Sequence, residues 1–325
     1  MAVIEVNHLT KRYGKHIAVD DLSFKVEKGQ IFGFLGPNGA GKSTTMNIMT
    51  GYLGASEGEV LIDGHNILEE PEAAKKCIGY LPEIPPLYTD MTVYEYLCFA
   101  AELKKIPKKE RKEAVDKALE MTKLEDMQAR LIKNLSKGYK QRVGLAQAIL
   151  GFPPIIILDE PTVGLDPKQI IEIRDLIKQL AKEHTVILSS HILQEVSAVC
   201  DHVMIISHGR LAASDTPENL EKMMCQEDVL ELEVMGGVAA VTQVIQDVAP
   251  ASSIENIKEY EGITSCQVVF ADGGDYREAL FYAFAEAQMA ILTMKSSTVS
   301  LEEIFLELTS GEQEDEEEDN DDSDL

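Results

Sequence analysis

The sequence contains no tryptophan, and only five of its 325 residues are cysteines. The cysteines are odd in number and show no CxxC spacing; they are Cys77, Cys98, Cys200, Cys225 and Cys266. This pattern argues against a disulfide framework and against a zinc site, and it favours a reducing compartment. Because 45% of the residues are hydrophobic, the chain can bury a large core without such cross-links.

Positive charge is also scarce. The chain has 30 Lys and Arg residues against 56 Asp and Glu residues, which gives a net charge of −26. Ten of the acidic residues lie between residues 312 and 324, and the rest of the chain still carries about −16. Non-specific binding to nucleic acid requires a basic surface, so no nucleic-acid partner is expected.

Long hydrophobic runs are absent as well. No apolar run approaches 18 residues, so no membrane-spanning helix is predicted. Residues 1–6 lack the basic start and the apolar centre of a signal peptide. If the protein works at a membrane, another chain must therefore carry the spanning helices.

The order of the predicted elements indicates an α/β domain over residues 1–220. Strands are predicted over residues 3–9, 22–26, 30–35, 59–62, 155–158 and 186–188, with a turn at 11–15. The last two strands are wholly apolar, which is typical of parallel strands covered on both faces. Residues 84–150 are predicted to form a helical subdomain, and its first two helices span 92–103 and 108–124.

A second, smaller domain is predicted over residues 225–310. Its elements read strand, helix, strand, strand, helix, strand, at about 230–234, 238–248, 253–259, 264–270, 276–289 and 290–295. This order predicts a ferredoxin-like α+β domain. Ser300 and Glu303 form a capping box for a final helix. The acidic tail at 311–325 is predicted to be disordered, and a solvated segment is favoured over a tail that binds a partner or a cation.

The most specific motif lies at residues 36–43, Gly-Pro-Asn-Gly-Ala-Gly-Lys-Ser, which match the pattern GxxxxGK[ST] in full. Glycines allow the backbone N–H groups of such a loop to turn inward around phosphate oxygens, and the following helix presents its positive N-terminal end to them. In this pattern Lys42 reaches the β- and γ-phosphates, and the hydroxyl of Ser43 ligates Mg²⁺. The sequence therefore predicts a nucleotide site.

Two carboxylates follow the predicted strand at 155–158. Asp159 and Glu160 stand at its carboxyl end, the edge where ligands of α/β sheets bind. Alone, this pair reads as an acidic loop. Beside a complete phosphate-binding loop, Asp159 is predicted to hold Mg²⁺ through water, and Glu160 is predicted to take the proton from an attacking water.

Two further motifs gain meaning from their positions. Leu135-Ser-Lys-Gly-Tyr139 precedes a predicted helix for which Ser136 is a natural N-cap. His191 follows the apolar strand at 186–188 and two serines. Taken alone, the motif at residues 135–139 indicates only the start of a helix, and His191 is a structural histidine at the surface.

Together these motifs resemble, in the same order, those of the ATP-binding subunits of ABC (ATP-binding cassette) transporters, over residues 3–215. The resemblance implies a P-loop NTPase fold of the ABC-cassette type that uses ATP and Mg²⁺. It places Tyr13 against the adenine, Ser136 and Gly138 at a γ-phosphate, and Gly164-Leu165-Asp166 at a dimer contact. It assigns nucleotide binding to Gly36, Pro37, Asn38, Gly39, Ala40, Gly41, Lys42, Ser43 and Thr44. The implied catalytic residues are Lys42, Glu160 and His191, with His191 at the γ-phosphate.

The chain departs from the family pattern at two motifs. Glu83 stands where the family usually has glutamine, so a carboxylate adds negative charge beside the phosphates and can still approach Mg²⁺. The signature, usually LSGGQ, reads LSKGY, which keeps Ser136 and Gly138 and adds the charge of Lys137. Both variants resemble the type-2 exporter branch of bacteria, whose ATPases often carry a C-terminal extension.

The resemblance implies an ATP-hydrolysing subunit that powers a transporter and, through the branch resemblance, an exporter. Each ATP would lie between the P-loop of one copy and the signature of another, in a homodimer or in a dimer with a related ATPase chain. A separate polytopic membrane subunit is the expected partner, with Glu83 and loop 84–91 as its contact. That partner places the chain at the cytoplasmic face of the cell membrane.

Two other functions stay open at this point. One is a soluble ABC ATPase that acts on DNA or ribosomes; the single P-loop, the single signature and the absence of a heptad run weigh against it. The other is a binding module without a membrane partner, in which residues 225–325 form a sensory or regulatory domain and ATP is the signal. No motif identifies a transported substrate.

Overall fold

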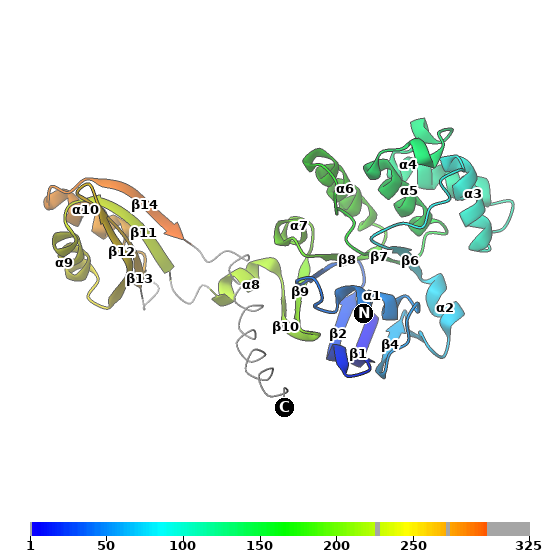
Figure 1. Ribbon diagram of the computed structural model, residues 1–325, viewed down its shortest axis with the longest axis horizontal. Helices are drawn as coiled ribbons and strands as arrows, with labels where there is room; N and C mark the ends of the chain where they lie inside the picture. The colour runs from blue at the N-terminus through cyan, green and yellow to red at the C-terminus, as the bar shows by residue number, and fades with distance from the viewer. Residues whose placement is uncertain (1, 225–227, 271–273, 298–325) are drawn as a thin grey trace, which may run out of the picture. The chain divides into compact units, whose positions relative to one another are not determined.

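The computed structural model describes residues 2–224, 228–270 and 274–297. Its contacts divide the chain into two compact units, with the division between Pro217 and Glu218. In Figure 1 the first unit is coloured blue to green and the second yellow to orange. The predicted helix after Ser300 and the acidic tail at 311–325 lie outside the described residues.

A six-stranded sheet forms the centre of the first unit. Its order is β10-β9-β3-β8-β7-β6, and all neighbours run parallel except β10, which is antiparallel to β9. The strands span Ile31–Leu35 (β3), Ile78–Leu81 (β6), Ile155–Leu158 (β7), Thr185–Ser190 (β8), His202–Ser207 (β9) and Arg210–Asp215 (β10). Side chains along the whole of β3, β7 and β8 are buried, which explains why the sequences of β3 and β7 are unbroken runs without polar side chains.

An antiparallel sheet of order β2-β1-β4-β5 shares one core with this central sheet. Its strands span Ala2–Tyr13 (β1), His16–Glu27 (β2), Glu57–Ile62 (β4) and His65–Asn66 (β5). In the shared core, the ring of Phe24 lies 5.9 Å from Phe32 and 5.1 Å from Phe34, between centroids. The prediction that the first strand ends at residue 9 is wrong, because β1 pairs with β2 through several register shifts and continues to Tyr13.

Three helices lie together beside the β6 end of the central sheet: α3 (Val93–Leu103), α4 (Arg111–Thr122) and α5 (Lys137–Ile149) (Figure 1). Thr92 and Glu95 form a capping box at α3, and Ser136 caps α5 as predicted. α4 begins three residues later than predicted, because residues 107–110 form a turn in which Glu110 N donates to the carbonyl oxygen of Pro107 at 2.8 Å.

Four further α-helices are described in this unit: α1 (Lys42–Met49), α2 (Pro71–Lys76), α6 (Pro167–Leu180) and α7 (Leu193–Ser197). α1 contributes Met46, Ile48 and Met49 to the shared core. α8 (Pro217–Met224) begins at the last residue before the division and continues into the second unit. Among the helices that the structure describes, none combines the length and the hydropathy needed to cross a membrane.

In the described part of the second unit, α8 is followed by a four-stranded sheet and two further helices. The elements are β11 (Asp228–Met235), α9 (Val238–Val248), β12 (Ser252–Tyr260), β13 (Ile263–Phe270), α10 (Arg277–Glu286) and β14 (Ile291–Ser297). The strand order is β12-β13-β11-β14, and every neighbouring pair is antiparallel. Alternate side chains of β11 and β13 share a core with Ile245 of α9 and Phe284 of α10, so both helices cover the same face (Figure 1).

Candidate functional site

A cavity of about 290 Å³ lies at the edge where four parallel strands of the central sheet end. β3, β6, β7 and β8 lead into the segments that carry the phosphate-binding motif, Glu83, Glu160 and His191 respectively. Parallel strands bring their carboxyl-terminal loops to one edge, which is why distant motifs meet here. The cavity is lined by Asn38, Gly39, Gly41, Lys42, Ser43, Thr44, Glu83, Glu160, Val163 and His191.

The loop at 36–43 takes its shape from glycine. Gly39 and Gly41 have φ angles of 87° and 101°, in the left-handed region that glycine adopts without strain. A Cβ on Gly41 would lie 2.5 Å from the carbonyl oxygen of Ala18, so the approach of β2 also requires glycine there. α1 begins directly after this loop, so the unpaired N–H groups of its first turn lie at the cavity.

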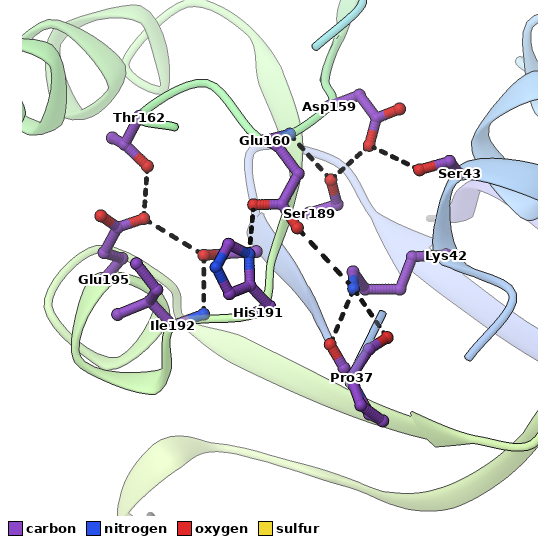
Figure 2. Close-up of polar contacts among 12 residues, drawn as sticks. Pro37, Lys42, Ser43, Asp159, Glu160, Thr162, Ser189, His191, Ile192 and Glu195 are labelled. Atoms are coloured by element: carbon purple, nitrogen blue, oxygen red, sulfur yellow. Dashed lines mark hydrogen bonds and ion pairs between the residues drawn. The ribbon is translucent and has the colours of Figure 1, made fainter. Parts of the chain in front are cut away.

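The ammonium group of Lys42 is buried beneath this loop. Lys42 Nζ donates hydrogen bonds to the carbonyl oxygens of Gly36 at 2.7 Å and Pro37 at 3.1 Å, and it lies 3.7 Å from Glu160 Oε1 (Figure 2). Desolvation lowers the pKa of Lys42, and the carboxylates of Glu160 and Asp159 oppose that shift. A buried ammonium held only by carbonyls and one carboxylate is well placed to turn toward a stronger anion.

Asp159 is joined to two hydroxyl groups. Its Oδ1 accepts a hydrogen bond from Ser189 Oγ at 2.6 Å and another from Ser43 Oγ at 3.3 Å. The Ser43 hydroxyl and the Asp159 carboxylate therefore lie next to each other, so Ser43 could ligate a magnesium ion directly and Asp159 could hold it through water. Carboxylate and hydroxyl oxygens are also the hard donors that Mg²⁺ prefers, so these residues fit the predicted metal.

Glu160 stands at the end of β7 in a strained conformation. Its φ of 48° is uncommon for a residue other than glycine, and its side chain is almost fully buried. Glu160 N donates to Ser189 Oγ at 2.9 Å, and Glu160 Oε2 lies 3.0 Å from His191 Nδ1. Contacts from the end of β8 therefore hold the strained backbone and direct the carboxylate to the cavity that it lines.

Several predicted site residues lie outside the cavity lining. Gly36 and Pro37 take part through the carbonyl oxygens that accept from Lys42, and Ala40 is buried in the same loop. Tyr13 ends β1 and is half-exposed, with the ammonium of Lys11 5.2 Å from its ring centroid. Glu83, the residue that replaces the usual glutamine of the family, is exposed and does line the cavity.

The signature residues stand apart from the cavity of their own chain. Ser136 is exposed and accepts a hydrogen bond from Tyr139 N at 3.4 Å, while Gly138 is buried against the side chain of Gln169. Lys137 Nζ lies so close to Gly164 that a Cβ there would approach it to 2.2 Å. The extra charge of the signature therefore lies against the segment 164–166.

Three buried polar residues around this site had no role predicted from the sequence. Ser189 links Asp159 to the backbone of Glu160, and Thr162 and Glu195 contact each other beside it (Figure 2). In the sequence, the one sign of these contacts was the pair of serines that follows the apolar run at residues 186–188 in β8. Glu195 lies on a short helix whose pattern does not mark it as buried.

Comparisons with known proteins agree with this geometry. A family model described as "ABC transporter" matches residues 19–163. The bacitracin transport ATP-binding protein BcrA of Bacillus licheniformis is 36% identical over 315 residues, which cover 95% of this chain and 98% of that protein. The linearmycin resistance ATP-binding protein LnrL of Bacillus subtilis (strain 168) is 31% identical over 311 residues, which cover 94% of this chain and 98% of that protein.

Solved structures extend the likeness to the fold. The ATP-binding subunit of an ABC transporter matches with a TM-score of 0.62 and 32% identity, over 68% of this chain and 92% of that one. A dimeric ATP-binding cassette bound to ADP and phosphate matches with a TM-score of 0.59 and 26% identity, over 66% of this chain and 98% of that chain. With a P-loop, two carboxylates and a histidine around one cavity, and with relatives that match along nearly the full chain, the protein belongs to the ATP-binding subunits of ABC transporters.

Proposed function

We propose that this chain hydrolyses ATP in the cavity at the end of β3 and that hydrolysis powers a separate membrane subunit of an exporter. The observation that carries the proposal is that Lys42, Ser43, Glu160 and His191 line one cavity. Asp159 lies next to it, hydrogen-bonded to Ser43. Relatives named for bacitracin transport and linearmycin resistance support a role in moving small molecules across a membrane.

Phosphate binding starts with Lys42. When the polyphosphate enters the loop, the Lys42 ammonium leaves the carbonyls of Gly36 and Pro37 and donates to the β- and γ-phosphate oxygens. The negative charge of the phosphates favours the protonated amine, so it raises a pKa that burial had lowered. Ser43 and Asp159 would hold Mg²⁺, which, when bound, neutralises charge on the phosphate oxygens.

Glu160 is the proposed general base. Once Lys42 has turned to the phosphates, Glu160 Oε1 can accept the proton of a water molecule beside the γ-phosphate. The oxygen of that water bonds to the γ-phosphorus, and the bond from phosphorus to the β–γ bridging oxygen breaks. ADP and inorganic phosphate leave, and His191 is the group that contacts the γ-phosphate during the step.

A second copy, or a related ATPase chain, would complete each site. Ser136 and Gly138 stand apart from their own cavity, so a head-to-tail dimer would bring one chain's signature to the other chain's γ-phosphate. A relative solved as a dimer with ADP and phosphate supports this arrangement. Closure would then depend on ATP, because neither chain alone offers all the contacts.

We also propose how the rest of the chain is used. Residues 1–220 would form the cassette, with a helical subdomain at 84–150, and residues 225–310 would form an accessory domain of the ferredoxin-like type. The cassette would lie at the cytoplasmic face of the membrane, with Glu83 and loop 84–91 against the membrane subunit. Ile84 in this loop is 81% exposed and Tyr88 is 56% exposed, which supports a docking role.

Substitution of Gly41 by alanine is expected to lower the affinity for ATP by about tenfold or more, because the left-handed φ and the 2.5 Å approach to Ala18 both resist a side chain. Titration with a fluorescent ATP analogue measures the loss. Gly29→Ala is the matched control, since Gly29 has a φ of 78° but nothing within 4 Å of an added Cβ. Equal affinities in both variants would show that close packing against β2 does not shape the loop.

Substitution of Ile84 by aspartate is expected to reduce recovery of the membrane subunit by about tenfold, because an exposed apolar anchor is replaced by a charge. Recovery is measured by affinity purification from detergent extracts, and ATP affinity should stay at the parent value. Leu103→Asp, at an apolar residue that is 65% exposed at the end of α3, is the control. Similar recovery with Ile84→Asp and the parent would remove loop 84–91 from the contact.

A further inference from the structure

A buried carboxylate lies behind the two loops that carry Glu160 and His191. Glu195, in α7, is 5% exposed, and its Oε2 accepts hydrogen bonds from two hydroxyl groups. One comes from Thr162 Oγ1, and the other comes from Ser190 Oγ at 3.1 Å (Figure 2). Among the ion pairs of the described residues, none involves Glu195, and the partners of its Oε2 are two neutral hydroxyl groups.

Both hydroxyl groups belong to segments that hold a site residue. Thr162 follows Glu160 by two positions in a tight turn, where Val163 N donates to the carbonyl oxygen of Glu160 at 3.3 Å. Ser190 precedes His191, and Ser190 Oγ also accepts from Ile192 N at 3.0 Å, so it fixes the backbone on both sides of the histidine. Glu195 thus connects the Glu160 segment to the His191 segment.

We propose that Glu195 is a positioning residue that holds Glu160 and His191 in register for ATP hydrolysis, an inference that rests on the proposed function. The direct contact between Glu160 Oε2 and His191 Nδ1, at 3.0 Å, is one cross-link between the two segments. The bridge from Thr162 through Glu195 to Ser190 is a second, and it lies outside the cavity lining. Two cross-links fix an orientation that one alone would leave free to rotate.

Burial of this carboxylate is not explained by stability alone. A buried charged group carries a desolvation penalty that neutral hydroxyl partners offset only in part, and an apolar side chain would fill the same place at lower cost. Hydrogen bonds that a carboxylate accepts from hydroxyl groups are, however, among the short and strong ones in proteins, so they restrict how far the joined segments can move. Stiffness between the two loops is the property that a general base and a phosphate-contacting histidine need.

The test compares kcat and ATP affinity between the full-length parent and its full-length variants. All are assayed either in complex with the same membrane subunit or, without it, at the same protein concentration. Glu195→Ala and Thr162→Val each remove the bridge, and each is expected to lower kcat by about ten- to a hundredfold, because a small displacement of reacting groups is costly. ATP affinity should stay within about threefold of the parent, since neither residue lines the cavity. Thr162→Ser keeps the hydroxyl and should restore most of kcat.

A double variant and a matched control separate positioning from general destabilisation. Thr162→Val with Glu195→Ala should be no slower than either single variant, because one bridge is removed in all three. Thr122→Val removes another buried hydroxyl, which bonds the Ala118 carbonyl inside α4, and it should lower the melting temperature without changing kcat.

Three outcomes would overturn the inference. They are a kcat within twofold of the parent in folded Glu195→Ala, a loss of ATP affinity as large as the loss of kcat, and additive effects in the double variant. If Glu195→Ala does not fold, Thr162→Val decides the question by the same readouts. If the parent chain itself shows no ATP turnover above its Glu160→Gln variant, the proposed function fails, and that result is distinct from a failure of Glu195 alone.

Discussion

Substitution of Glu160 by glutamine is expected to lower ATP turnover by about a hundredfold or more while ATP still binds. Glutamine keeps the shape of the side chain and its hydrogen bond to His191 but cannot take a proton from water. The contacts of Lys42, Ser43 and the glycine loop with the phosphates do not depend on that proton, so affinity should stay near the parent value. Phosphate release measures turnover, and equilibrium dialysis measures binding.

A control is needed because any Glu-to-Gln change alters the net charge of this acidic chain. Glu120→Gln makes the same change at an exposed position on α4 and should leave turnover at the parent level. Turnover near that of the parent in Glu160→Gln would remove Glu160 from the role of base. It would turn attention to His191, which contacts Glu160 at the cavity and, unlike Lys42, is not assigned to bind the phosphates as a cation.

Substitution of Lys42 by methionine is expected to lower ATP affinity by about a hundredfold, because hydrogen bonds from an ammonium to phosphate oxygens are among the strongest in proteins. Methionine fills a similar volume, so the loop should keep its place. ATP binding is measured by isothermal titration calorimetry, because the chain contains no tryptophan whose fluorescence could report it.

The same variant carries a prediction about pH. Burial lowers the pKa of Lys42 in the folded protein, so the protonated amine destabilises the nucleotide-free fold at neutral pH. The usual pKa of lysine is 10.5. As pH rises from the lowered pKa of the folded state toward that value, the destabilisation by Lys42 declines, so the free energy of unfolding increases over this range. Lys178→Met, at an exposed position on α6, should change neither affinity nor this pH dependence. Unchanged ATP affinity in Lys42→Met would contradict its proposed contact with the phosphates.

Local patterns predicted the parts of the structure that depend on local physics. The P-loop needs glycine at positions of positive φ and a helix directly after it, and both features lie within nine residues. The helix predicted over 238–248 is α9, because an apolar stripe of 3.6-residue period is complete within that segment. Glu160 and His191 were placed in one site only through the family resemblance, and their direct contact, 31 positions apart, became visible in the structure, where the parallel neighbours β7 and β8 end at one edge.

Features that depend on distant partners were not predicted. The length of β1 is set by pairing with β2 and β4 through register shifts that no local pattern reveals. The strained backbone of Glu160 depends on Ser189, which lies on another strand. Likewise, the burial of Glu195 arises from Thr162 and Ser190, and the place of Lys137 arises from Gly164, so only the folded chain brings out these contacts.

The measurement that tests the central claim most directly is affinity purification of tagged Glu160→Gln protein from detergent-solubilised membranes of its own source, with and without ATP. An ATPase subunit that powers a transporter should bring with it a polytopic membrane protein and should recover as a dimer when ATP is present. Recovery of this chain alone, as an ATP-dependent dimer without any membrane protein, would contradict the transporter role.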